Sequence, residues 1–126
     1  MPPLVTAAVS FMFAAFIFYT VGVWSAALSR RLKPWHAMLF WLGFVSDTTG
    51  TEIMRQMAGG FRWEFHTATG MLALFLMFGH AVWATAVLAR RHDSQLRTFH
   101  RTSLVVWTIW LIPFVTGLVL GARRGR

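Results

Sequence analysis

Apolar residues along this chain fall into four long runs that are separated by short polar stretches. The helices predicted from them span about residues 4–28, 35–54, 65–88 and 94–120. Each run approaches or exceeds the roughly 20 apolar residues with which a helix crosses the hydrocarbon layer. Because the connections are short, consecutive helices are expected to be antiparallel neighbours. The pattern predicts an all-α fold: a transmembrane four-helix bundle with up-down-up-down topology, formed by residues 1–126 as one domain.

The composition supports a membrane protein and excludes several kinds of chemistry. Hydrophobic residues make up 56% of the 126 residues and charged residues only 13%. The chain has no cysteine, which excludes disulfides, thiolate metal ligands and a cysteine nucleophile. It also has no phosphate-binding loop, nucleophile elbow or zinc signature, so the sequence gives no support to a soluble enzyme.

The formal net charge of +8 is better explained by the bilayer than by nucleic acid, because the basic residues lie in the helix connections. Seven of the twelve flank the first and third connections, and the other five lie toward the opposite end. Basic residues are enriched in cytoplasmic loops. We therefore expect loops 1–2 and 3–4 to be cytoplasmic and both termini to lie outside.

The third predicted helix carries His66 and His80, fourteen residues apart. At 100° per residue this spacing places both imidazoles on one face, about 21 Å apart along the axis. The positions between and beside them on that face are mostly small: Thr69, Gly70, Ala73, Met77, Ala81 and Ala84. This face predicts a shallow groove in which a flat ligand could lie.

Two residues of an antiparallel hairpin lie at the same depth when their numbers average to the centre of the turn. His80 and His100 average to 90, which is the turn between the third and fourth helices. By the same rule His36 lies within a turn of this level. Two level imidazoles inside a bundle can hold a haem iron from both sides. We therefore predict haem b as the cofactor and His80 and His100 as its metal ligands, with Arg97 and Arg101 near the propionates.

The second helix becomes polar midway, where Asp47 lies in the sequence Ser-Asp-Thr-Thr-Gly-Thr-Glu. A carboxyl group at this depth is expected to face the bundle interior. It could be a hydrogen-bonded clamp between helices or a second-layer group of the haem site. A different function class is also open: a proton- or cation-coupled transporter or channel subunit using Asp47, Glu52 and His66. A third reading is a cofactor-free assembly subunit.

Several stretches resemble the HsmA family of small bacterial membrane proteins with four spans. The resemblance rests on Leu42–Phe44, Asp47–Thr51, His66–Gly70, His80–Ala84, Phe99–His100 and Val106–Pro113. It implies haem binding, haem-dependent protection against oxidative stress and a place in the bacterial plasma membrane. Whether the chain is itself an enzyme with redox or oxidant-detoxifying activity stays open.

The fourteen-residue histidine spacing also resembles that of membrane b-type cytochromes, in which each histidine serves a different haem. That resemblance implies a second haem at His66, with Glu52, Met54 or a partner chain as the other ligand. The residues expected to bind the cofactor are His66, Gly70, Met77, His80, His100, Arg101, Trp107 and Asp47. The electron donor and the pairing of two bundles into a homodimer are left open.

Overall fold

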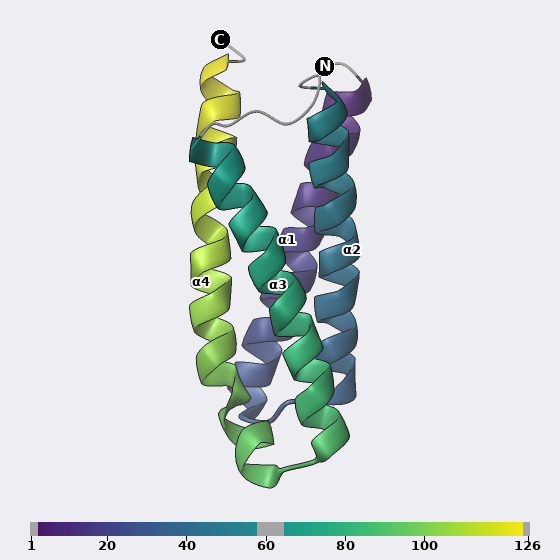
Figure 1. The fold of residues 1–126 in the computed structure, drawn as a ribbon, viewed down its shortest axis with the longest axis vertical. Helices are drawn as coiled ribbons and strands as arrows, with labels where there is room; N and C mark the ends of the chain where they lie inside the picture. Colours follow the sequence, from purple (N-terminus) through teal and green to yellow (C-terminus); the bar gives the residue numbers. More distant parts are fainter. Residues whose placement is uncertain (1–2, 58–64, 125–126) are drawn as a thin grey trace.

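Four helices form nearly all of the part of the chain that the computed structural model describes, which is residues 3–57 and 65–124. The side chains of residues 57, 65–68 and 120–124 are outside this description. The helices are α1 (Pro3–Ser29), α2 (Pro34–Met57), α3 (Phe65–Arg90) and α4 (Asp93–Arg124). Figure 1 shows them side by side along the long axis of the molecule. The predicted all-α bundle is confirmed, with bounds close to those expected from the apolar runs.

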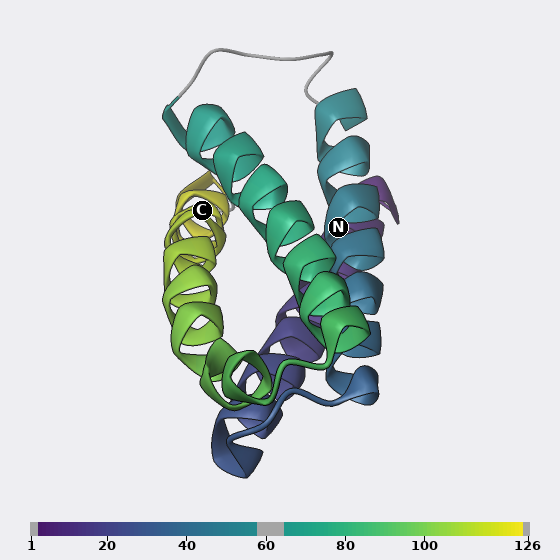
Figure 2. The same cartoon turned by 60° about the horizontal axis from the view of Figure 1, so that its bottom comes forward.

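The helices alternate in direction and form a ring in which α1 packs against α2 and α4, and α3 packs against the same two helices. The α1–α2 interface is the most extensive of the four. Residues 30–33 and 91–92 connect the helices at one end, which we call the turn end (Figure 2). The start of α1 and the end of α4 lie at the other end (Figure 1).

Three of the described helices are long and apolar enough to cross a membrane: α1 over Pro3–Ser29, α3 over Thr69–Arg90 and α4 over Asp93–Val119. Many of their large apolar side chains point outward, as expected for contact with lipid; Leu72 and Phe75 are examples. The polar second half of α2 lowers its hydropathy, so this helix is not among the three. A span by α2 stays a prediction, supported by its packing along α1.

Two non-glycine residues with positive φ end the helices at the turn end. Arg30 has a φ of 53° and follows α1, and Arg91 has a φ of 55° and follows α3. This left-handed conformation is the usual way to stop an α-helix, although glycine adopts it with less strain. Beyond Arg30, the Leu32 N–H donates to the Leu96 carbonyl oxygen at 2.8 Å. This bond fastens the α1–α2 connection to the first turns of α4.

Glycines allow α1 and α2 to approach closely. A Cβ atom at Gly43 would lie 2.6 Å from the Tyr19 ring, and one at Gly22 would lie 2.8 Å from the Phe40 ring. Both distances are too short for a side chain, so glycine is required at these two contacts. The same holds at Gly50, where a Cβ atom would lie 2.9 Å from the Met12 sulfur.

Candidate functional site

Asp47 lies in the core of the bundle and links three helices. Its side chain is buried, and its Oδ2 atom accepts hydrogen bonds from the Tyr19 hydroxyl of α1 at 3.1 Å and the Trp110 indole N–H of α4 at 3.0 Å. The Tyr19 and Trp110 rings also pack edge to face, with centroids 5.0 Å apart. The predicted inward direction of Asp47 is confirmed. Its described contacts are those of a clamp between helices.

His80 lies nearer the turn end, where α2, α3 and α4 meet. Its imidazole is buried, and its Nε2 atom lies 2.8 Å from the Ser103 hydroxyl oxygen. The rings of Phe40 and Phe99 contact it, with centroids at 4.5 Å and 5.3 Å. Its Nδ1 atom is buried and has no hydrogen-bond partner. The predicted depth is confirmed, since the contacts join residues at the levels expected for both hairpins.

His100 lies on α4 between the two residues that contact His80, but on a different face. The inward face of α4 runs through Phe99, Ser103, Val106 and Trp110, all of which are buried. His100 is 100° further round the helix than Phe99. Its half-buried side chain lines a groove of about 550 Å³ together with Arg30, Ser94, Arg97, Thr98 and Arg101. The level argument therefore placed His100 at the right depth, but it did not predict the direction in which His100 points.

The arrangement around His80 does not provide the gap that a porphyrin bound between His80 and His100 would need. The side chains that meet His80 from α4 are Phe99 and Ser103, both buried. Coordination of iron by the His80–His100 pair stays a prediction, and the packing gives it no support.

The other residues expected at the cofactor are spread over the bundle. Met77 is buried in a cluster with Tyr19 and Trp110, and Gly70 has no atom near its Cβ position within 4 Å. The Trp107 indole N–H donates to the Thr20 hydroxyl at 3.0 Å, so this side chain joins α4 to α1. The side chain of His66 lies outside the described residues, and with it the predicted second haem.

The residues of the transport alternative do not form a shared path in the described part of the chain. Glu52 is exposed and pairs with Arg55, one turn further along α2. Asp47 is engaged with Tyr19 and Trp110, as described above. Glu52 therefore makes contacts typical of a surface ion pair, and Asp47 makes the contacts of a clamp between helices.

His36 is a further buried imidazole, at the first turn of α2. Its Nδ1 atom accepts a hydrogen bond from the Lys33 backbone N–H at 3.0 Å, so the proton of the neutral ring is on Nε2. Nε2 is buried and has no partner. A metal-binding histidine normally coordinates through one nitrogen and donates from the other. The contact with Lys33 therefore makes His36 a poor metal ligand.

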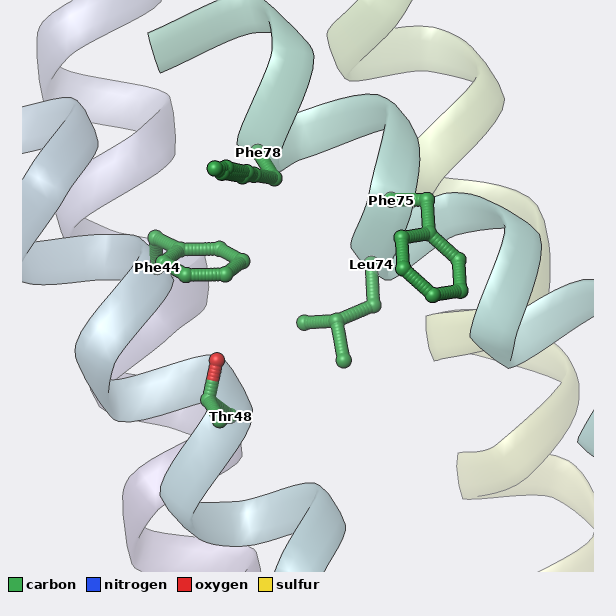
Figure 3. A pocket seen from close by; sticks show the side chains of 5 residues that line it. All are labelled: Phe44, Thr48, Leu74, Phe75 and Phe78. Carbon is green, nitrogen blue, oxygen red and sulfur yellow. The ribbon is translucent and has the colours of Figure 1, made fainter. Parts of the chain in front are cut away.

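A second cavity, of about 240 Å³, opens between α2 and α3 and was not expected from the sequence. Figure 3 shows its lining: Phe44, Thr48, Leu74, Phe75 and Phe78. The Phe44 and Phe78 rings meet edge to face across it, with centroids 5.4 Å apart. No lining residue is charged or able to bind a metal ion. This cavity suits an apolar ligand rather than a polar cofactor.

Sequence reasoning missed Ser103 and Arg30. Ser103 lies within a turn of the level of His80 by the hairpin rule, and its spacing from Phe99 would have placed Ser103 and Phe99 on one face. Arg30 contributes to the groove because α1 packs against α4, a contact between helices that are not consecutive in the chain. Neither of the two hairpins considered from the sequence contains that contact.

In comparisons with protein-family models, with curated proteins and with solved structures, nothing matches this chain. The likeness to the HsmA family consequently rests on the sequence stretches quoted above.

Proposed function

We propose that this chain is an integral membrane protein that binds haem b, with His80 as a ligand of the iron. The observation that carries the proposal is the state of the His80 side chain. It is buried, one ring nitrogen meets only a neutral hydroxyl, and the other has no partner. A buried polar atom without a partner costs about 1–3 kcal/mol. An apolar residue would fill this position without that cost, so we attribute the imidazole to function.

The residues around His80 define what binding would require. Haem would supply an iron that accepts imidazole nitrogen and changes oxidation state. The Nε2 atom faces α4, so its use as a ligand would replace the contact with the Ser103 hydroxyl. A porphyrin would also need the space that Phe99 fills. We therefore assign no second axial ligand and no reaction step; His100, His66 and the propionate partner Arg101 stay predictions.

An absorption spectrum of the purified full-length chain with added haem tests the proposal. We expect a Soret band that shifts on reduction in the unchanged protein, and loss of haem binding in His80→Ala. His92→Ala is the matched control, because His92 is exposed at the turn end. Haem binding that is unchanged by His80→Ala would show that the assignment is wrong.

A second pair of variants separates ligation from structural damage. Ser103→Ala removes the hydroxyl that competes for Nε2, so haem binding is expected to be kept or strengthened. His100→Ala is expected to convert a six-coordinate spectrum to a five-coordinate one only if His100 is the second ligand. Loss of haem in Ser103→Ala with an intact fold would contradict ligation through Nε2.

A further inference from the structure

Arginines from two helices meet in the groove at the turn end. Arg30 follows α1, and Arg97 and Arg101 lie in the first turns of α4. Arg97 and Thr98 lie three and four residues after Ser94, and Arg101 lies seven residues after it, so the four residues share one face of α4. The groove has a volume of about 550 Å³, and the His100 imidazole completes its lining.

The backbone fixes Arg30 above this face of α4. Its φ of 53° reverses the chain at the end of α1, and its N–H donates to the Ala27 carbonyl oxygen at 3.2 Å. Two residues later the Leu32 N–H is bonded to the Leu96 carbonyl oxygen. Arg30 is therefore placed by two backbone bonds and not only by its flexible side chain.

The positive charge of the groove is only partly compensated. Arg97 lies 3.6 Å from Asp93, and this carboxylate is shared with Arg31 at 2.7 Å. Among the residues that the structure describes, Arg30 and Arg101 form no ion pair. The Nδ1 atom of His100 is buried in the same region without a hydrogen-bond partner. The groove thus offers two uncompensated guanidinium groups to an anion.

The chemistry of these groups matches a phosphate group. Guanidinium donors bind phosphate oxygens in a forked geometry, and the first turn of a helix adds a favourable dipole for an anion. Ser94 brings its hydroxyl and the N-terminal end of α4 to the same groove. A phosphate group would satisfy charge and hydrogen-bonding capacity together.

The surroundings of the groove indicate a lipid as the source of that phosphate. Both helices that form the groove are long and apolar enough to cross a membrane. Leu28, two residues before Arg30, is 82% exposed, and Trp24 packs edge to face on Trp107 along the α1–α4 seam. Apolar surface next to basic residues at a helix end is the setting in which headgroups bind.

We propose that the groove formed by Arg30, Ser94, Arg97, Thr98, His100 and Arg101 binds the phosphate group of an anionic membrane lipid. The proposal does not depend on iron ligation by His80, although the groove includes His100 and Arg101, which were also predicted to lie at the cofactor. The acyl chains would lie along the apolar surface of α1 and α4, which continues from the groove.

Native mass spectrometry of the full chain tests the proposal with phosphatidic acid and phosphatidylcholine of the same acyl chains. We expect the protein to retain phosphatidic acid preferentially. Arg30→Gly and Arg101→Gln are each expected to lower this retention about tenfold, the loss typical of one charge-assisted contact. Glycine suits the positive φ of Arg30, so the fold is not expected to suffer.

Arg91→Gly is the matched control, because Arg91 has the same backbone conformation and charge but does not line the groove. It is expected to retain lipid like the unchanged protein. Equal losses in Arg30→Gly and Arg91→Gly, or equal retention of the two lipids, would overturn the proposal. Inorganic phosphate is tested in parallel; if it displaces phosphatidic acid at low millimolar concentration, the site belongs to free phosphate and the lipid assignment is wrong.

Discussion

Asp47 shows how a single carboxyl group is accommodated in an apolar interior. Two donors from different helices, the Tyr19 hydroxyl and the Trp110 indole N–H, reach the same oxygen atom. Each bond replaces part of the hydration that the group loses on burial. Because the donors are themselves buried, the three side chains depend on one another.

Substitution of Asp47 should reveal that dependence. Asp47→Ala leaves the Tyr19 hydroxyl and the Trp110 N–H without an acceptor, so we expect a loss of about 2–4 kcal/mol in stability. Asp47→Asn keeps a carbonyl oxygen and should lose clearly less. Thermal unfolding of the detergent-solubilised variants measures both. Equal stability of Asp47→Ala and the unchanged protein would rule out the clamp.

At this scale the sequence predicted depth better than direction. His80 lies against Phe40 and Phe99, as the hairpin levels require. The rotation of α4 about its axis was not predictable from the position of His100 alone. It is set by the burial of large side chains such as Phe99 and Trp110 in the core. That rotation turns His100 into the basic groove.

At the scale of elements, α1 and α2 are held together by close packing at glycine residues. Gly43 faces the Tyr19 ring at a distance that leaves no room for a methyl group. Tyr19 cannot move aside without losing its bond to Asp47. The polar clamp and the close helix approach are consequently parts of one contact.

Gly43→Ala is expected to destabilise the bundle by about 1–3 kcal/mol, the usual effect of overpacking. Gly79→Ala is the matched control, because a Cβ there meets no atom within 4 Å. It should be neutral or stabilise by up to about 1 kcal/mol through helix propensity. The two variants are compared by their unfolding temperatures. A neutral Gly43→Ala would mean that α1 and α2 can separate without loss.

The apolar runs predicted the helices well because each run lies within one helix. They carried no information on contacts between helices far apart in sequence. The α1–α4 seam, and with it the position of Arg30, depends on how the two hairpins come together. Single-helix periodicity cannot determine that arrangement.

At the scale of the whole molecule, both turns lie at one end of the bundle (Figure 2). The excess of basic residues in these connections predicts that this end faces the cytoplasm. The groove of the lipid proposal lies at the same end. With this orientation, the lipid would bind from the cytoplasmic leaflet.

Cysteine labelling tests the orientation directly, since the natural chain contains no cysteine. Lys33→Cys and His92→Cys lie in exposed positions at the turn end, and Gln56→Cys lies in an exposed position near the other end of α2. In intact cells an impermeant maleimide should label only Gln56→Cys. Labelling of Lys33→Cys and His92→Cys alone would show the opposite orientation. Labelling of only one of these two variants would contradict the predicted topology.

The bond between Leu32 and Leu96 joins the two hairpins of the molecule where their backbones turn. The Arg31–Asp93 ion pair adds a second connection at the same place. A backbone hydrogen bond and an ion pair thus couple the two hairpins at the turn end, so a change in the angle between the hairpins would have to pivot there or break these bonds.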